Sequence, residues 1–242
     1  MGRKSEIDIL ASFDSERAQS AAEIVRKTGL PRSTVFRALR LLVDTAFVRQ
    51  EPGTSRYVLG PRILQLGLLA RQQLSPEELV ATPLLALAAQ TRETVTFSLV
   101  DTPWRLCVFV LDAPSDLRSV AQPGMRYSLH LGAASSAILA NLPTDVAIQT
   151  LRFHGVPEPD MDAIMAHLDE IRAFGSATSI GQRVAGASSV AAPVMLNGSV
   201  FGSVAVAGPS DRMSPHLDEF RTAVTRVAQD LSDRLAQRPS LR

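Results

Sequence analysis

The feature that most restricts the fold of this chain is a pair of closely spaced helix signals within residues 20–43. Ser20 and Glu23 form a capping box, in which each side chain satisfies a backbone N–H group of the other residue at a helix start. Gly29 ends that helix, and Pro31, a residue favoured in a first turn, begins the next one. A helix, a short glycine turn and a second helix are the outline of a helix-turn-helix motif.

Two short extended segments follow the second helix directly. Residues 47–50 (FVRQ) and 56–59 (RYVL) flank a turn that contains a Pro-Gly pair. This arrangement predicts a β-hairpin, the wing of a winged helix-turn-helix domain. A further helix is expected before the motif, over about residues 5–13, with three apolar residues facing a core: Ile7, Ile9 and Leu10.

Charge is distributed unevenly along the chain. The sequence holds 25 Lys and Arg against 24 Asp and Glu, but residues 1–74 contain 12 basic and 7 acidic residues, and residues 75–242 contain 13 and 17. A basic first third beside an acidic remainder favours contact of the first third with a polyanion. The surplus is small, so this inference depends on the motif as well.

The second helix of the pair and the hairpin carry residue types that contact DNA. In a winged helix-turn-helix domain the first residues of the second helix reach base edges, and the helix ends and the wing touch phosphates. Arginine suits guanine edges and phosphates, and hydroxyl groups suit phosphates or either base type. The predicted contact residues are Arg32, Ser33, Thr34, Arg37 and Arg40 on the helix, and Thr54, Ser55 and Arg56 on the wing. The alternative is that these arginines only solvate exposed faces.

The helix expected from residue 61 to about residue 73 is too apolar for a one-sided surface helix. Its apolar residues are Ile63, Leu64, Leu66, Leu68 and Leu69. Such a helix requires burial on more than one side, and a second subunit is the expected source. The sequence therefore predicts a linker helix through which two copies of the chain pair.

The next helix is expected from a second capping box, Ser75 to Glu78, as far as Gln90, with a kink or restart at Pro83. Extended segments are then expected at 94–100, 104–111, within 119–131, at 190–196 and at 199–207. The last two flank Asn197-Gly198, a strong hairpin signal.

Helices are expected at 133–142, from a cap at Thr144, from a cap at Asp160 as far as Phe174, and from Ser214 onward. The fold class is therefore α+β: a winged helix-turn-helix domain over 1–60, a linker helix over 61–75, and a domain built on an antiparallel sheet over 76–242.

Signatures of an enzyme or a metal site are weak. The chain lacks the common nucleophile, phosphate-binding, dinucleotide-binding and zinc-protease motifs. Cys107 lies in an apolar segment and is expected to be a packed thiol. The serine pairs at 135–136 and 188–189 have no local His or Asp partners. We expect no catalytic residue, no metal and no cofactor, since the histidines show no ligand spacing: His130, His154, His167 and His216.

The compartment follows from two further observations. The lone cysteine excludes an intramolecular disulfide, which fits a reducing environment. The sequence has no apolar run as long as a membrane span and no signal-peptide core. We therefore expect a cytoplasmic protein that has no membrane partner.

Taken together, these motifs resemble those of the IclR family of transcriptional regulators. The resemblance is carried by residues 29–39 (GLPRSTVFRAL), 47–49 (FVR) and 56–64 (RYVLGPRIL), and continues with 93–95 (ETV), His130, 191–194 (AAPV) and 206–209 (VAGP). It implies a winged helix-turn-helix domain, a linker helix that pairs subunits, and a ligand-sensing domain resembling GAF modules. It also implies a dimer or tetramer on double-stranded DNA at a palindromic operator, controlled by a small-molecule effector such as an organic acid or an aromatic compound.

The resemblance places the wall of the effector pocket at Ala133, Ala134, Ser179, Ser189, Ala205 and Ala207. Acid-binding members have an aspartate, a cysteine and two serines at four of these positions. This chain has Ser179, Ser189, Ala205 and Ala207 there. The helix start at Ala133 can receive an anion through backbone N–H groups. The rest of the wall has fewer hydrogen-bonding groups, and each unpaired polar group of a buried ligand would cost about 1–3 kcal/mol.

These substitutions favour an effector larger or more apolar than a two- or three-carbon keto acid, an aromatic acid for instance. The alternative is that the small residues only pack together and that no ligand enters. For the whole chain the sequence favours a ligand-responsive regulator, a repressor rather than an activator. Two other classes stay open: an enzyme domain with an accessory helix-turn-helix, and a sensor that acts through protein partners.

Overall fold

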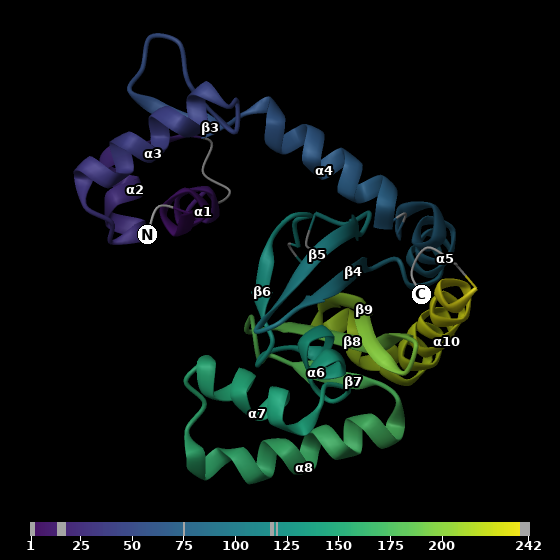
Figure 1. Cartoon of the computed structure of the whole chain (residues 1–242). Coiled ribbons are helices and arrows are strands. Elements are labelled where there is room, and N and C mark those ends of the chain that lie inside the picture. The colour runs from purple at the N-terminus through teal and green to yellow at the C-terminus, as the bar shows by residue number, and fades with distance from the viewer. Residues whose placement is uncertain (1–2, 14–17, 75, 117–118, 120, 238–242) are drawn as a thin grey trace. The chain divides into compact units, whose positions relative to one another are not determined.

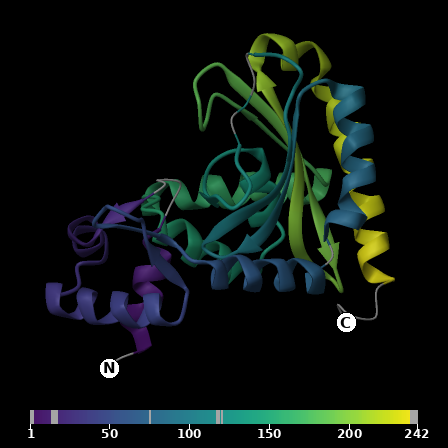
Figure 2. The ribbon, with the colours of Figure 1, turned by 90° about the horizontal axis from the view of Figure 1, so that it is seen from above.

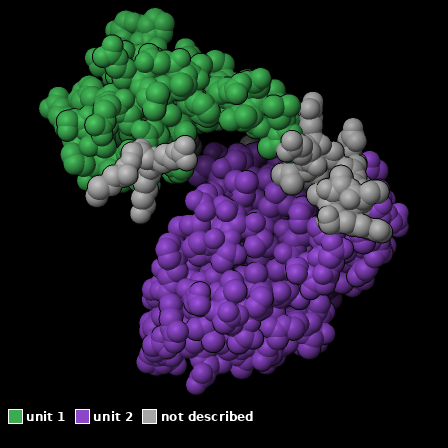
Figure 3. Space-filling model, in the orientation of Figure 1, with its two compact units in different colours: residues 1–75 green, residues 76–242 purple. Residues whose placement is uncertain are grey.

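The computed structural model describes residues 3–13, 18–74, 76–116, 119 and 121–237, and at residues 3–4, 71–74 and 76–79 it describes the backbone alone. The contacts between residues divide the chain into two compact units, residues 1–75 and residues 76–242 (Figure 3). Each unit has its own hydrophobic core, so each is described by itself.

The first unit combines four helices and three strands in its described part (Figure 1). Its helices are α1 (Arg3–Ala11), α2 (Ala21–Thr28), α3 (Arg32–Asp44) and α4 (Pro61–Leu74). Its strands are β1 (Gln19–Ser20), β2 (Val48–Gln50) and β3 (Arg56–Leu59), which form an antiparallel sheet in the order β1-β3-β2. The predicted helix-turn-helix and hairpin are confirmed, and β1 is an addition that the sequence reading missed.

The local signals at the helix-turn-helix act as the sequence predicts. The backbone N–H of Ser20 donates to Glu23 Oε2 at 2.6 Å, and Ser20 Oγ accepts from the N–H of Glu23 at 3.3 Å, so the capping box is complete. Gly29 ends α2 with φ of 67°, a left-handed conformation that a residue with a Cβ rarely adopts. Three residues after Gly29, α3 begins at Arg32, directly after Pro31.

The core of this unit is a small aliphatic cluster. Its fully or almost fully buried residues are Ile9, Ile24, Val35, Ala38, Leu39, Leu42 and Val48. The prediction that Ile7 faces this core was wrong, because its side chain is 65% exposed. Ile7 and Ile9 are two positions apart in α1, so they point to nearly opposite sides of the helix and only one of them can face the core.

The second unit is built on a sheet of six antiparallel strands within its described residues, in the order β6-β5-β4-β9-β8-β7. The strands are β4 (Thr94–Asp101), β5 (Trp104–Leu111), β6 (Arg126–Ser128), β7 (Ala177–Ile180), β8 (Ala187–Leu196) and β9 (Ser199–Pro209). The sequence did not predict the strand β7. It predicted extended structure within residues 119–131, of which only Arg126–Ser128 form the strand β6. The turn at Asn197-Gly198 joins β8 to β9 as predicted.

Helices cover both faces of this sheet. On one face α5 (Pro76–Thr91) and α10 (Leu217–Ala236) lie side by side (Figure 2). The other face carries α6 (Ala133–Leu139), against which α8 (Glu158–Phe174) packs, and α7 (Thr144–Phe153) packs on α8. A short helix, α9 (Ser210–Met213), and a 3₁₀ turn (Ser214–His216) lead from β9 into α10.

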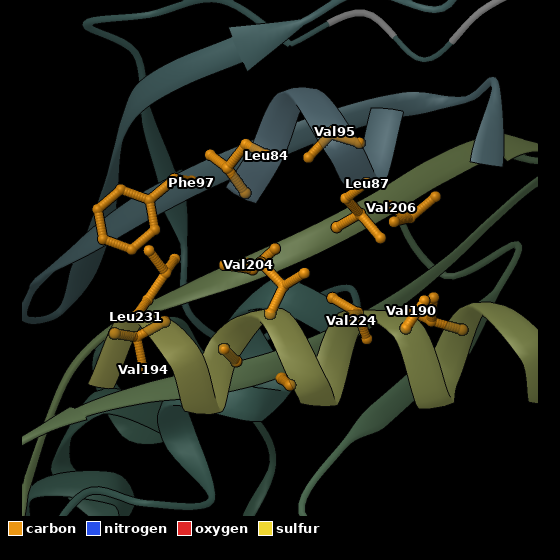
Figure 4. Close-up of a cluster of buried hydrophobic side chains, with 14 of the residues drawn as sticks. Leu84, Leu87, Val95, Phe97, Val190, Val194, Val204, Val206, Val224 and Leu231 are labelled. Atoms are coloured by element: carbon orange, nitrogen blue, oxygen red, sulfur yellow. The ribbon is translucent and has the colours of Figure 1, made fainter. Parts of the chain in front are cut away.

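The two faces of the sheet differ in chemistry because side chains alternate along each strand. The face toward α5 and α10 is aliphatic and aromatic: Val95, Phe97, Val190, Val194, Val204 and Val206 pack against Leu84, Leu87, Val224 and Leu231 (Figure 4). The face toward α6 carries small and hydroxyl-bearing residues: Thr94, Thr96, Ser98, Ser189, Ala191, Ser203, Ala205 and Ala207.

Several predicted helix starts require correction. Pro143 and Pro157 precede α7 and α8, and neither helix start has a side-chain cap. The predicted caps are therefore wrong: Thr144 is the first residue of α7, and Asp160 lies inside the first turn of α8, which starts at Glu158. Proline has no side-chain acceptor, so neither residue can cap the helix that follows it.

Two further expectations concern α5 and α10. The helix α5 does not restart at Pro83, since it is continuous from Pro76 to Thr91. The second capping box, at residues 75–78, lies outside the described side chains. In α10 the predicted apolar stripe is confirmed from Phe220 to Leu235, although the helix begins at Leu217 rather than at Ser214.

Adjacent leucines of α5 provide a test of this packing. Leu84 is fully buried, whereas Leu85 is 55% exposed. Leu84→Ala is expected to lower the free energy of unfolding of the second unit by about 2–5 kcal/mol, because it leaves a cavity in the core. Leu85→Ala should change it by less than about 0.5 kcal/mol. Urea unfolding followed by the fluorescence of Trp104, the only tryptophan, measures both, and equal losses would contradict the assignment of the core.

Candidate functional sites

The exposed side of α3 is rich in arginine. Arg32, Ser33, Arg37 and Arg40 are exposed, and Thr34 is half-buried. The opposite side of the helix is anchored in the core of the first unit by buried residues such as Leu39. The structure therefore presents the predicted residues of α3 outward from a fixed helix.

The arginines of this surface have few partners of their own. The Arg32 guanidinium lies 5.6 Å from the centre of the Phe36 ring. With the described residues, the side chains of Arg37 and Arg40 form no ion pair and no hydrogen bond. The same holds for Arg49, an exposed residue of β2 that the sequence reading missed. An arginine at an outward position of the wing strand was the signal that could have identified it.

A hollow of about 530 Å³ separates α3 from the hairpin. It is lined by Phe36, Arg37 and Arg40 of α3, and by Gln50 and Tyr57 of the hairpin, among others. Two arginines, an exposed aromatic ring and the carboxylate of Asp44 thus face the same hollow. Arginine and aromatic side chains of this kind suit phosphates, base edges and the thymine methyl group.

Arg56 differs from the other predicted contact residues, because its guanidinium is held within the unit. Its Nε and Nη2 atoms donate to the carbonyl oxygen of Ala18 at 3.2 and 2.6 Å, and Nη2 lies 3.3 Å from Glu23 Oε2. Arg56 therefore ties the hairpin to the capping box of α2. The pKa of Glu23 is lowered from its ordinary value, chiefly by the backbone N–H of Ser20, then by the Ser20 hydroxyl, with a smaller effect of Arg56.

The hairpin turn is stabilised by one of the predicted wing residues. Thr54 Oγ1 donates to the carbonyl oxygen of Glu51 at 3.2 Å and accepts from the N–H of Arg56 at 3.2 Å. Ser55 is exposed beside it. The hydroxyl of Thr54 thus has a structural task, whereas that of Ser55 faces solvent.

In the second unit the six residues assigned to the effector pocket line a single pocket: Ala133, Ala134, Ser179, Ser189, Ala205 and Ala207. The register of the sheet explains why they meet. Ser179 of β7 pairs with Ser189 of β8, which pairs with Ala207 of β9, so the three lie in one row across the sheet. The first residues of α6 face this row from the other side of the pocket.

The same pocket holds a buried arginine that the sequence reading missed. Arg105 of β5 is only 8% exposed. Its Nε donates to Ser135 Oγ at 3.0 Å and its Nη1 to Ser98 Oγ at 2.8 Å. Burial lowers the pKa of Arg105 to about 10, so the guanidinium stays protonated at neutral pH. The signal in the sequence was a charged residue at an inward-facing position of an otherwise apolar strand.

A second arginine lies at the same pocket. The guanidinium groups of Arg105 and Arg183 lie 4.6 and 5.4 Å from the centre of the Tyr127 ring, and all three residues line the pocket. Among the described lining residues there is no Asp or Glu. The pocket therefore carries a positive charge that no described lining residue neutralises.

The wall holds more hydrogen-bonding groups than the four compared positions alone indicate. Thr96, Ser119 and Ser188 add hydroxyl groups, and Arg105 adds guanidinium N–H groups. The expectation compared only four positions of β7, β8 and β9, whereas the fold brings β4, β5 and β6 to the same pocket. The helix whose start was expected to receive an anion, α6, has only seven residues.

The histidines and the cysteine that the structure describes are placed as follows. The rings of His130 and His154 stack with 4.8 Å between their centres, and His154 Nε2 lies 2.6 Å from the carbonyl oxygen of Pro103. Cys107 is fully buried, as expected of a packed thiol. The described residues contain no cluster of three or more potential metal ligands. They also contain no helix whose length and hydropathy would suit a membrane span.

Comparison with known proteins decides the family. Residues 7–52 match the IclR helix-turn-helix domain, and residues 73–233 match the C-terminal domain of the bacterial transcriptional regulator IclR. The chain belongs to the IclR family. As an IclR-family protein it is a transcriptional regulator with a helix-turn-helix DNA-binding domain, and the resemblance drawn from the sequence is confirmed.

Similar proteins agree over nearly the whole length of the chain. The transcriptional repressor AllR of Klebsiella pneumoniae is 28% identical over 236 residues, which cover 92% of this chain and 85% of AllR. A putative IclR regulator from Silicibacter sp. TM1040 has a similar structure, with a TM-score of 0.88, 24% identity and full coverage of both chains. An IclR homologue from Microbacterium hydrocarbonoxydans, solved with 4-hydroxybenzoate, gives a TM-score of 0.81 at 19% identity over 96% of this chain and 97% of that one. These structures confirm the predicted α+β fold class.

The link between Glu23 and the backbone of Ser20 can be tested by pH. Because the folded pKa of Glu23 is lowered, its carboxylate stabilises the fold above its unfolded pKa, and this contribution is lost as the pH falls through the folded pKa. Glu23→Gln should therefore lower the melting temperature of the first unit at neutral pH, and the difference from wild type should vanish in acid. Calorimetry measures it, with Glu51→Gln on the hairpin as the control. A difference that persists in acid would contradict this role of the charge.

Proposed function

We propose that this IclR-family regulator is a ligand-responsive repressor that binds a palindromic operator as a dimer or tetramer. The observation that carries the proposal is the set of exposed arginines on α3 and β2, which have no acidic partner among the described residues. The relative AllR is named a transcriptional repressor, which supports repression rather than activation. The cytoplasm, where such an operator is found, is the proposed compartment.

DNA recognition is assigned to α3 and the hairpin. In this proposal α3 enters the major groove, where Arg32, Ser33, Thr34, Arg37 and Arg40 read base edges and hold phosphates. The hairpin contacts the backbone through Arg49, Thr54 and Ser55. Arg56 acts on DNA indirectly, because its contacts with Ala18 and Glu23 fix the position of the hairpin.

Oligomerisation is assigned to α4. The side chains of Leu64, Leu66, Leu68 and Leu69 are between 41% and 65% exposed in the isolated chain. Four exposed leucines on one helix are costly in water, and pairing of α4 with a second copy would bury them. A two-fold arrangement of two recognition helices then accounts for a palindromic operator.

The effector is assigned to the pocket between α6 and the sheet, with Ala133, Ala134, Ser179, Ser189, Ala205 and Ala207 as its wall. We favour a small organic acid, because the wall combines alanines with the buried charge of Arg105. The 4-hydroxybenzoate bound to the Microbacterium homologue supports an organic acid as the ligand class. A pocket that only packs small residues would have no use for this unneutralised guanidinium.

Regulation then follows from coupling between two sites. An effector that binds one arrangement of the second unit better than another shifts the population toward it. In our proposal α4 transmits that shift to the spacing of the two recognition helices. The affinity for the operator changes as a result.

The DNA assignment is tested by fluorescence anisotropy on the DNA upstream of the protein's own gene, against scrambled DNA, at two salt concentrations. The wild type should prefer the upstream DNA at both. Arg37→Ala should weaken binding by about tenfold or more. If Arg37 holds a phosphate, the slope of affinity against salt should also fall by about one, and if it reads a base, the sequence preference should fall instead.

The control for this experiment is Arg226→Ala, which removes an exposed arginine from α10 in the other unit. It should leave affinity, salt slope and sequence preference unchanged. An Arg37→Ala protein with the affinity and preference of the wild type would exclude Arg37 from the DNA contact.

The assignment of α4 is tested by Leu66→Glu. A carboxylate at this position would be buried in the paired form, so the variant should be monomeric and should bind the operator weakly. Analytical ultracentrifugation and anisotropy measure these two properties. Leu85→Glu makes the same substitution at an exposed leucine of α5, outside α4, and serves as the control. An oligomeric, DNA-binding Leu66→Glu protein would show that α4 is not the pairing element.

A further inference from the structure

The pocket between α6 and the sheet contains two guanidinium groups. None of its described lining residues carries a negative charge. Arg105 lies at its buried side, with two of its N–H groups on Ser135 and Ser98. Arg183 reaches the pocket from the segment between β7 and β8 and is exposed. Both groups lie over the ring of Tyr127, and Arg183 lowers the pKa of Arg105, though less than burial does. Two cations near one aromatic ring repel each other, and an anion bound to both offsets this repulsion.

The hydroxyl partners of Arg105 leave its charge uncompensated. A guanidinium has five N–H groups, and the described side chains accept from two of them. Serine hydroxyls supply hydrogen bonds but no negative charge. A buried charge of this kind is costly unless it is paired, so the ligand must supply the counter-charge.

The segment that carries Arg183 is fixed to the start of α6. Gln182 Oε1 accepts from the N–H of Gly132 at 3.3 Å and from Ser179 Oγ at 3.1 Å. Gly181 and Gly186 border the segment with φ of 67° and 76°. These contacts place Arg183 at the exposed side of the pocket, away from the buried position of Arg105.

We propose that the effector is a dianion, an organic molecule with two carboxylate groups, one bound by Arg105 and the other by Arg183. The chain between the two carboxylates is short, because the pocket measures only about 50 Å³, and it lies against the alanines of the wall, Ala205 and Ala207 among them. A monocarboxylate neutralises only one of the two cations. This inference rests on the proposed function, since it names the ligand class of the pocket assigned to the effector.

The experiment compares each dicarboxylate with its own monoamide, which has the same shape and one charge less. The probes are short linear dicarboxylates, their monoamides and acetate, because the pocket has a volume of only about 50 Å³. Isothermal titration calorimetry and thermal shift are carried out on the full chain with each probe at up to millimolar concentration. At least one dicarboxylate should bind about tenfold or more tightly than its monoamide, because a charge-assisted hydrogen bond is lost.

The variants separate the two arginines. Arg183→Gln changes an exposed residue, so it should fold normally and should abolish the preference for the dicarboxylate over the monoamide. Arg105→Met should weaken both by about tenfold or more. The control, Arg126→Gln, removes an arginine that lies over Trp104 and pairs with Asp101 outside the pocket, and it should leave the preference intact.

Three results would overturn the inference. The first is that no dicarboxylate binds the wild type. The second is that each monoamide binds as tightly as its dicarboxylate, and the third is that Arg183→Gln retains the preference. Operator binding is measured on the same preparations. A protein that binds the operator but does not prefer dianions contradicts only the proposed ligand class, whereas a protein that does not bind the operator contradicts the proposed function.

Discussion

The alternation of side chains along the central sheet is the constraint on which the second unit depends. In β4, Val95 and Phe97 point into the aliphatic core against α5 and α10, while Thr96 and Ser98 point to the opposite face. One strand therefore serves the stability of the unit and its pocket at once. The small side chains of the second face, such as Ala205, leave the space that the pocket occupies, because a larger residue at that position would fill it.

The hydroxyl groups of that face also explain how a guanidinium is tolerated inside the unit. Ser98 of β4 and Ser135 of α6 accept hydrogen bonds from Arg105, which offsets part of the cost of burying its N–H groups. An aliphatic residue at either position would leave these donors unpaired. The charge itself is not offset by the described residues, so the same arrangement that permits the arginine also creates the requirement for an anion.

The features that the sequence predicted correctly have short-range causes. The capping box at Ser20, the stop at Gly29 and the hairpin at Asn197-Gly198 each depend on a few adjacent residues, so their patterns can be read directly. Arg105 could not be placed in the pocket in this way, because its partners lie 7 and 30 residues away and are brought together only by the fold. The strand β1 was missed for the same reason: two residues form a strand only because β3 lies beside them.

The two units use the same functional group in different electrical surroundings. On α3 the guanidinium groups of Arg37 and Arg40 are exposed, so their field is screened by salt and acts on the extended charge of a polyanion. Arg105 is buried, where screening is weak and only a molecule that enters the pocket meets its charge. Exposure thus separates the two recognition tasks proposed for this chain, that of DNA on α3 and that of a small anion at Arg105.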